Sequence, residues 1–308
     1  MSYTYLLAGE GLELAEAELK GFLASHGLEK NVERKNKLAF TESEPAQLKR
    51  LALTHEITEL LSRTDTEEPE IEYRPENSYA VRAKDLTEMD RKEEVEEEIG
   101  GKISTKENSV DLERPEEVIK AYIFEDELII GKMVQDIDRG LFEKRKNQER
   151  PFSSPVSLDP VLARVLVNLS EVSAGESVLD PFCGTGGILI EAGLCGCGVA
   201  GTDVKEEMVK GTRKNLEEYG IIAHDIRESE VSEAHEVFDD KFNAVITDLP
   251  YGKASKETSR PVEDFLESYQ ELTEGKTVFM YNEEKLGGFE ADFEIYVHGS
   301  LTRYLFVQ

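Results

Sequence analysis

A glycine-rich turn that follows an aspartate is the feature of the sequence that points most directly to chemistry. Residues 178–187 read VLDPFCGTGG, so that an apolar stretch ends in Asp180 and turns through glycines. Glycines let a backbone approach a ligand closely, and N–H groups at the start of a helix attract electronegative atoms. The pattern is not a nicotinamide fingerprint, which would need glycine where Leu189 stands, and no phosphate-loop pattern GxxxxGK[ST] occurs.

Two further aspartates follow the next predicted strands. Asp203 ends the second strand and is suited to accept hydrogen bonds from a ribose diol, and Asp225 ends the third. Each one alone could simply cap a helix. Together with Asp180 they face the crevice at the carboxyl ends of parallel strands, where ligands bind in this architecture. The sequence therefore predicts a nucleoside-type ligand at this edge.

A second motif, Asp248-Leu249-Pro250-Tyr251-Gly252, follows the fourth predicted strand. It could be only a turn, because Pro and Gly interrupt strands. A carboxylate and a loop carbonyl can also accept hydrogen bonds from an exocyclic amino group while a tyrosine ring stacks on a planar base. That arrangement favours methyl transfer to an amino nitrogen, whose lone pair must be localised before it attacks.

These motifs resemble those of a known family. The DPFCGTGG turn resembles the S-adenosylmethionine-binding motif of class I methyltransferases, and DLPYG resembles the [DN]PPY motif of enzymes that methylate amino groups of bases. Residues 150–169, RPFSSPVSLDPVLARVLVNL, look like the segment that precedes the turn in archaeal tRNA guanosine-10 N2-methyltransferases. One position differs from the family motif, because Leu249 stands where family members usually have proline.

The resemblance implies a tRNA guanine-N2 methyltransferase that uses S-adenosylmethionine and forms N2-methylguanosine or N2,N2-dimethylguanosine, with position 10 as the expected target. It implies these cofactor-binding residues: Asp180, Phe182, Gly184, Thr185, Gly186, Asp203, Val204, Asp225 and Ile226. Asp203 would bind the ribose and Asp225 would lie near the adenine amine. Asp248, Leu249, Pro250 and Tyr251 would form the catalytic loop, and Phe152 and Cys183 would line the pocket.

The elements that must position these residues alternate in the C-terminal half. Strands are predicted at 177–182, 198–204, 221–226, 242–248 and 276–282, and helices at 159–169, 187–194, 206–219 and 261–273. This alternation is typical of a doubly wound parallel sheet. Segments 289–298 and 301–307 are separated by two residues and must form an antiparallel hairpin. The expected fold is a class I, Rossmann-like α/β domain that ends in this hairpin.

The N-terminal half reads as two smaller α+β units. Strands are expected at 2–8, 37–40, 78–83, 110–113, 118–124 and 128–138, and helices at 12–25, 45–61 and 90–99. By the family resemblance we expect a ferredoxin-like domain at 1–65, a THUMP domain at 66–138, a basic linker at 139–154 and the methyltransferase domain at 155–308.

Charge is the most unusual global property. With 36 basic and 65 acidic residues the net charge is −29, and both halves of the chain are acidic. Such a surface repels phosphate at low salt, so alone it argues against nucleic acid, and we prefer adaptation of a halophilic source to high salt. The clearly basic stretch is 139–150. We predict that Arg139, Lys144, Arg145, Lys146 and Arg150 contact the RNA backbone, with a plain linker as the alternative.

Several classes are excluded or left open. No apolar run is long enough to span a bilayer and no signal peptide is evident, so we expect a cytoplasmic protein with no membrane partner. The three cysteines form no zinc-type spacing and read as small buried hydrophobes, and no metal is expected.

The expected partners are tRNA and a small zinc-binding activator protein, which some relatives have. Two alternatives stay open: an amino-methyltransferase for rRNA guanine or for adenine in DNA or RNA, and an inactive RNA-binding module.

Overall fold

The computed structural model describes residues 1–9, 11–43, 46–87, 90–124, 127–155, 157–250, 260–298 and 301–308. The chain divides into two compact units. The first contains Met1–Leu12, Asn31–Leu48 and Thr54–Ile137, and the second contains Glu13–Lys30, Lys49–Leu53 and Asp138–Gln308. Two segments from the N-terminal half thus belong to the second unit.

The first unit is built on an eight-stranded sheet in the order β2-β3-β1-β4-β8-β7-β5-β6. Its strands are β1 (Tyr3–Leu7), β2 (Glu33–Lys35), β3 (Leu38–Thr41), β4 (Thr54–Asp65), β5 (Ser78–Asp85), β6 (Ser109–Val110), β7 (Glu117–Phe124) and β8 (Glu127–Asp136). Strand β4 pairs with β1 on one side and with β8 on the other, both antiparallel. It therefore joins the two halves of the sheet into one.

The predicted helix at 45–61 is wrong. This segment forms a short 3-10 helix η1 (Leu48–Arg50) and then enters the long strand β4. Leu48, Leu51 and Ala52 have the spacing of a helix face, but β-branched Thr54, Ile57 and Thr58 favour a strand. Strand β4 pairs with β1 on one edge and with β8 on the other, so tertiary structure overrides the local periodicity.

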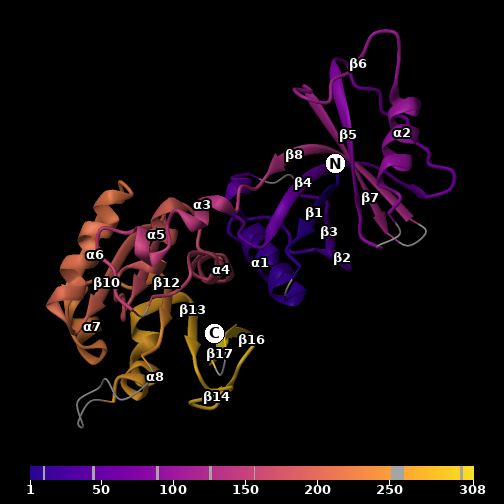
Figure 1. The fold of residues 1–308 in the computed structure, drawn as a ribbon. Helices are drawn as coiled ribbons and strands as arrows, with labels where there is room; N and C mark the ends of the chain where they lie inside the picture. The colour runs from indigo at the N-terminus through magenta and orange to yellow at the C-terminus, as the bar shows by residue number, and fades with distance from the viewer. Residues whose placement is uncertain are drawn as a thin grey trace. The chain divides into compact units, whose positions relative to one another are not determined.

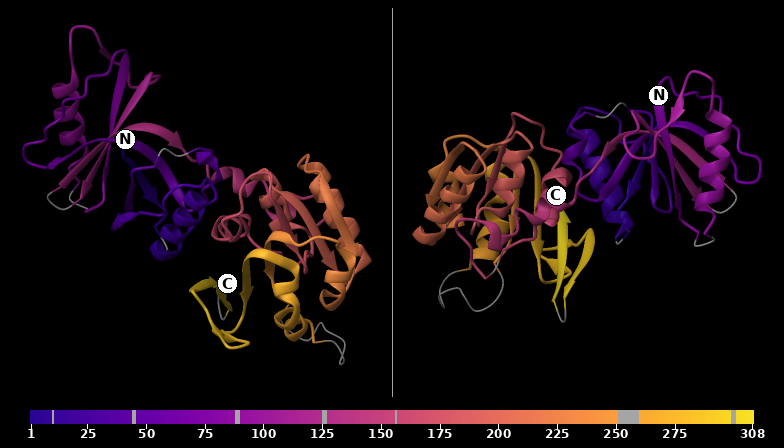
Figure 2. Two further views of the ribbon diagram at one scale, coloured as in Figure 1. Left: turned by 180° about the vertical axis from the view of Figure 1, so that it is seen from behind. Right: turned by 45° about the horizontal axis from the view of Figure 1, so that its top comes forward.

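Helix α2 (Lys92–Ile103) covers one face of this sheet against β5 and β7, as the two views in Figure 2 show. Its apolar side is narrow, since only Val95, Ile99 and Ile103 are buried, at the i, i+4, i+8 spacing of a helix. They pack with Tyr79 and neighbouring strand residues into one core. The run of glutamates on α2 occupies its other faces.

The second unit has a seven-stranded sheet in the order β11-β10-β9-β12-β13-β17-β16. Its strands are β9 (Ser177–Asp180), β10 (Gly198–Asp203), β11 (Ala223–Glu228), β12 (Phe242–Asp248), β13 (Thr273–Tyr281), β16 (Phe293–His298) and β17 (Leu301–Val307). The first five run parallel, and β17 pairs antiparallel with both β13 and β16. The expected parallel sheet with a terminal antiparallel hairpin is confirmed.

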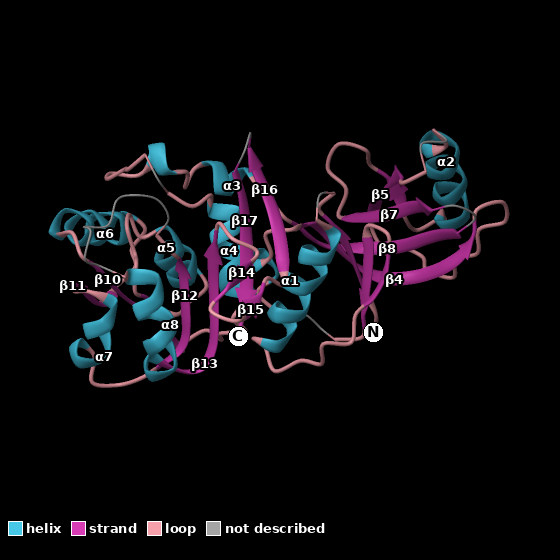
Figure 3. Ribbon diagram, turned by 90° about the horizontal axis from the view of Figure 1, so that it is seen from below, coloured by secondary structure: helices cyan, strands magenta, loops and turns pink. Residues whose placement is uncertain are grey.

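Helices cover both faces of this sheet (Figure 1; Figure 3). They are α3 (Gly140–Glu143), α4 (Pro160–Leu169), α5 (Gly187–Leu194), α6 (Glu206–Glu218), α7 (Ala234–Val237) and α8 (Pro261–Leu272), with short turns η2 (Asn147–Glu149) and η3 (Val231–Glu233). Helices α4, α5 and α6 contact one another in turn, and α7 contacts α8. Phe265 of α8 packs on Leu179, Val245 and Phe279 of the sheet. A small hairpin, β14 (Lys285–Leu286) and β15 (Phe289–Glu290), follows β13.

Helix α1 (Leu12–Ala24) lies in the second unit, although it follows β1 directly. Gly21 of α1 lies so close to α4 that an added Cβ would come within 2.2 Å of the Asn168 carbonyl oxygen. Only glycine permits this approach of two helices. The domain boundaries expected from the family resemblance stay a proposal, and they would assign α1 to the first domain.

No helix among the described residues is both long and apolar enough to cross a membrane. Most other predicted elements agree with the structure to within a few residues, including α5, which matches residue for residue. The predicted strand at 110–113 shortens to the two residues of β6.

Candidate functional site

The glycine turn between β9 and α5 requires backbone conformations that favour glycine. Gly184 has φ of 51° and Gly186 has φ of 79°, and both values lie in the left-handed region that favours glycine. Gly186 occupies the N-cap of α5, where a Cβ would lie 2.8 Å from the Thr212 side chain. The Gly186 N–H donates to the Cys183 carbonyl at 2.7 Å. The turn thus leaves the N-terminus of α5 open to an electronegative group.

Asp180, at the end of β9, is buried with 2% of its surface exposed. Its Oδ1 accepts hydrogen bonds from the Thr247 hydroxyl at 2.7 Å and from the Phe182 N–H at 3.1 Å. Burial raises the pKa of Asp180 to about 7, and the charges of Asp248 and Asp203 add to the rise. Asp180 therefore binds a proton more readily than an exposed aspartate does.

Asp203, at the end of β10, connects its strand to the turn. Oδ2 accepts the Gly184 N–H at 3.1 Å, and Oδ1 accepts the Lys205 N–H at 2.9 Å. Burial raises the pKa of Asp203, while these two backbone donors oppose the rise. Each oxygen keeps a second lone pair for a ligand. Val204, which follows, is 57% exposed, so its side chain is available to a planar group.

The third strand end contributes differently. Asp225 lies within β11, half-buried, and its carboxylate forms an ion pair with Arg227. Ile226 is buried at 2% exposure. The prediction that Asp225 ends the third strand is wrong: Asp225 pairs with Ala200 of β10, and Glu228 is the residue that pairs with Asp203 at the carboxyl end. The strand continues for three residues beyond Asp225, whose side chain already has Arg227 as a partner.

Asp248 ends β12, next to β9 in the sheet, and Leu249 follows it into the loop. Leu249 is fully buried, and its N–H donates to the Met280 carbonyl at 3.0 Å. A proline could not make this bond, so the sheet itself fixes the first loop residue here. Pro250 is exposed, and Tyr251 lies outside the described residues.

Two residues at this site were not predicted from the sequence. Arg303 of β17 donates from Nη1 to Asp248 Oδ1 at 2.5 Å, and the exposures of the two side chains are 7% and 18%. Burial raises the pKa of Asp248 to about 6, against the opposing charge of Arg303. The other residue is Thr247, whose hydroxyl donates to Asp180. A basic residue inside an otherwise apolar strand, LTRYLFV, is the signal that could have identified Arg303.

The segment before α4 packs around the turn. The Phe152 N–H and carbonyl both bond to the Asn215 side chain of α6, which also donates to the Thr185 carbonyl at 2.9 Å. A Cβ on Gly211 would lie 2.0 Å from the Phe152 ring, so glycine is required at that point of α6. Asn215 thereby joins Phe152, predicted to line the pocket, to the turn. Cys183, Cys195 and Cys197 are buried free thiols, as expected.

The predicted RNA-binding residues separate into two groups. Arg145 forms an ion pair with Glu191 of α5 at 2.6 Å, and Arg150 is only 5% exposed. The guanidinium of Arg150 donates to the Arg145 carbonyl and to Ser157, and it contacts the Thr185 hydroxyl at 3.4 Å. Both arginines therefore act inside the protein. Lys144 is exposed, Lys146 is half-exposed in a pair with Glu143, and Arg139 is half-buried.

A buried polar network continues from Glu191 to α1. Arg164 of α4 pairs with Glu191 at 2.8 Å and donates to the Arg50 carbonyl at 3.2 Å. Arg50 donates to Asn168, which in turn donates to Glu18 of α1 at 2.8 Å. Burial raises the pKa of Glu18, and the Ala52 and Leu53 N–H groups bonded to its carboxylate oppose the rise. Ionisable groups therefore link α1 to α5, the helix of the cofactor turn.

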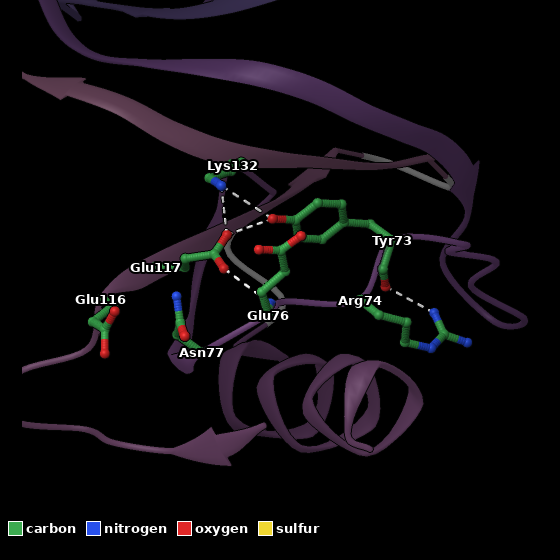
Figure 4. A pocket seen from close by; sticks show the side chains of 7 residues that line it. All are labelled: Tyr73, Arg74, Glu76, Asn77, Glu116, Glu117 and Lys132. Atoms are coloured by element: carbon green, nitrogen blue, oxygen red, sulfur yellow. Dashed lines mark hydrogen bonds and ion pairs between the residues drawn. The ribbon is translucent and has the colours of Figure 1, made fainter. Parts of the chain in front are cut away.

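A groove of about 390 Å³ lies in the first unit (Figure 4). It is lined by Tyr73, Arg74, Glu76, Asn77, Glu116, Glu117 and Lys132. Glu117 accepts hydrogen bonds from Tyr73, from Lys132 and from the Glu76 N–H, and Arg74 donates to nearby backbone carbonyls. These contacts satisfy the central polar groups of the groove within the protein, and none of the residues predicted to carry chemistry lies there.

Comparison with known proteins identifies the C-terminal unit. Residues 147–286 match the family described as UPF0020, RMKL-like methyltransferase domain. The chain is 36% identical to a tRNA (guanine(10)-N2)-dimethyltransferase of Methanothermobacter thermautotrophicus over 91% of this chain and 88% of that one. It is 30% identical to the protein of the same name from Methanocaldococcus jannaschii over 98% of both chains.

Solved structures agree on the fold over the whole chain. TrmN from Thermus thermophilus superposes with a TM-score of 0.54 at 19% identity, covering 100% of this chain and 99% of that one. A possible methylase from Clostridium difficile gives a TM-score of 0.52 at 15% identity, over 99% and 97% of the two chains. Both neighbours share the fold of this chain.

Proposed function

We propose a function from one premise: this chain belongs to the family of archaeal tRNA (guanine(10)-N2)-dimethyltransferases. It is an enzyme that methylates the N2 amino group of a guanine in tRNA. We assign position 10 as the target and S-adenosylmethionine as the methyl donor. We also expect it to act in the cytoplasm, where it would meet its tRNA.

The residues at the sheet edge fit S-adenosylmethionine. The cofactor carries a sulfonium and an ammonium group, and Asp180 and Asp203 place acidic groups at the carboxyl ends of two neighbouring strands. The open N-terminus of α5 behind Gly184 and Gly186 suits a carboxylate. When bound, the cofactor supplies an electrophilic methyl group. Asp203 would hold the ribose with its remaining lone pairs, and Val204, Asp225 and Ile226 would border the adenine.

Asp248 is the residue that we assign to the acceptor base. Its carboxylate would accept a hydrogen bond from the guanine N2 amino group, which concentrates the nitrogen lone pair and receives the proton that leaves on methylation. The buried Leu249 supplies a fixed start to the loop, and Tyr251 is proposed to stack on the base. The observation that carries this assignment is a buried, arginine-bound carboxylate at the end of β12, beside the strand of the glycine turn.

The test is methylation of an unmodified tRNA transcript followed by mass spectrometry of its nucleosides. We expect N2-methylguanosine and N2,N2-dimethylguanosine at position 10, and methyladenosine or methylated rRNA alone would refute the proposal. Asp248→Ala should lower turnover by ~10²-fold or more, while the cofactor affinity, read by calorimetry, stays within about threefold. Undiminished turnover in this variant would show that Asp248 is structural.

Binding of tRNA is assigned to the N-terminal half and to part of the basic segment. We propose that the ferredoxin-like and THUMP domains, 1–65 and 66–138, hold the single-stranded end of tRNA mainly through shape and base contacts. Lys144 and Lys146, with Arg139, would contact the backbone, whereas Arg145 and Arg150 support the site from within. A small zinc-binding activator protein stays among the proposed partners, and a halophilic source is proposed for the acidic surface.

A further inference from the structure

Arg303 reaches the catalytic loop from the C-terminal hairpin. It lies on β17, which is separated from β12 by β13. Asp248 pairs with Met280 of β13, and Met280 pairs with Leu305 of β17. Paired residues share a face of a sheet, and Arg303, two residues from Leu305, shares that face too. Because β17 runs antiparallel, Arg303 lies toward the carboxyl end of β12, and its long side chain spans the intervening strand.

The contact joins two groups that are both withdrawn from water. Arg303 Nη1 lies 2.5 Å from Asp248 Oδ1, with 7% and 18% of the two side chains exposed. A carboxylate in such surroundings tends to take up a proton, and a neutral carboxyl group is a poor hydrogen-bond acceptor for an amino group. Among the described residues, the charged groups that face Asp248 are Asp180 from β9 and Arg303 from β17. The negative charge of Asp180 disfavours the ionised form of Asp248, and the positive charge of Arg303 favours it.

We propose that Arg303 is a positioning residue for methyl transfer: it keeps Asp248 ionised and fixes its orientation, so that Oδ2 is presented to the amino group of the acceptor base. This inference rests on the proposed function. It assigns the C-terminal hairpin a part in the chemistry, although none of the motifs that identify the enzyme lies there.

Kinetics of three variants across pH test the proposal. Arg303→Met should lower kcat by ~10–10³-fold at pH 7, with KM for tRNA and the cofactor affinity within about threefold of the parent. The acid limb of its kcat profile should move up by about one pH unit or more, so that part of the activity returns near pH 9. Arg303→Lys keeps a cation and should retain most of the parent profile.

Leu305→Ala is the matched control, because it weakens the same strand on the same face at a fully buried position. It should lower the melting temperature without moving the acid limb. If Arg303→Met has the parent profile, or if both variants lose kcat with no change of the limb, Arg303 is only structural and the proposal fails.

A measurement without turnover separates this proposal from the proposed function. The pKa of Asp248 is followed by carbon NMR of labelled aspartate carboxyls, with Asp248→Asn used to assign the signal. We expect a higher pKa in Arg303→Met than in the parent, and an unchanged pKa would overturn the role of Arg303. Absence of tRNA methylation by the parent protein would instead refute the proposed function.

Discussion

Asp203 combines a structural contact with the proposed cofactor contact, and the two can be separated by substitution. Its carboxylate accepts the Gly184 and Lys205 N–H groups. Asp203→Ala removes these bonds and those to the ribose, and should weaken S-adenosylmethionine binding by about 1–3 kcal/mol. Asp203→Asn keeps one acceptor oxygen and should lose less. Calorimetry measures the affinity, and equal affinity in a folded Asp203→Ala protein would contradict the assignment.

Asp180 should make the stability of the ligand-free protein depend on pH. Its folded pKa of about 7 lies above the unfolded value of 3.8, so between these values the native state holds a proton that the unfolded chain has released. The free energy of unfolding should therefore fall as pH rises through this window, by up to about 1.4 kcal/mol per pH unit. Asp180→Asn should flatten the slope and retain the bond from Thr247.

Urea unfolding between pH 4.5 and 8 measures this slope. Asp111→Asn is a suitable control, because Asp111 is an exposed carboxylate whose pKa is lowered by bonds from the Arg114 and Glu113 N–H groups. It should leave the slope between pH 5 and 7 as it is. Parallel curves for the parent and Asp180→Asn would mean that Asp180 does not titrate in this range.

The site residues that lie in a contiguous motif were predictable, and those that act from a distance were not. Asp180, Gly184 and Gly186 are identified by a local pattern, because a tight turn restricts residue type over a few positions. Arg303 reaches Asp248 from 55 residues further along the chain. Arg150 looked like an RNA ligand because its charge is visible in the sequence, whereas its burial depends on packing between elements.

At the level of elements, the buried network between α4 and α5 should make the second unit sensitive to the loss of any one charged partner. Glu191 has no exposed surface and pairs with both Arg145 and Arg164. Glu191→Gln leaves two poorly hydrated guanidinium groups without a carboxylate and should destabilise the protein by about 3–5 kcal/mol.

Glu206→Gln is the control, since it breaks the exposed pair with Lys210 on α6 and should change stability by at most about 1 kcal/mol. Urea unfolding compares the two variants. Similar small losses in both would show that the buried arginines find other partners.

The elements themselves were predictable where periodicity and caps agree. Helix α4 begins as expected, with the Asp159 side chain accepting the Val161 N–H and Pro160 in the first turn. The structure of segment 45–61 was not predictable, because its apolar spacing fits a helix. The strand β4 that forms there depends on pairing with β1 and β8, which lie far away in sequence. The membership of α1 in the second unit depends on close contact with α4 at Gly21, which no local pattern reveals.

For the whole molecule, a net charge of −29 has to be reconciled with binding to RNA. Charge reversal at Lys144 and Lys146 should weaken tRNA binding and reduce the slope of log affinity against log salt by roughly two to four. Arg145 is left intact, because its reversal would break the buried pair with Glu191. Lys285→Glu, in an exposed pair on β14, should change the slope less.

The same salt titration, read for methylation, tests adaptation to high salt. Near 1 M salt the Debye length falls to about 3 Å, so repulsion between the acidic surface and phosphate is screened. Activity that persists or peaks there supports a halophilic source, and activity confined to low salt excludes it. An unaltered binding slope in the lysine variant would remove the basic segment from the RNA interface.

The place of α1 in the second unit also determines when this helix can make its native contacts during protein synthesis. Glu18 and its partner Asn168 are 150 residues apart, a separation that takes roughly 10–30 s to translate. Until α4 has left the ribosome, the carboxylate of Glu18 and the guanidinium of Arg50 lack the groups that surround them in the native protein. Helix α1 can therefore make its native contacts with α4 only after residue 168 has been synthesised, although its own residues precede that point by about half of the chain.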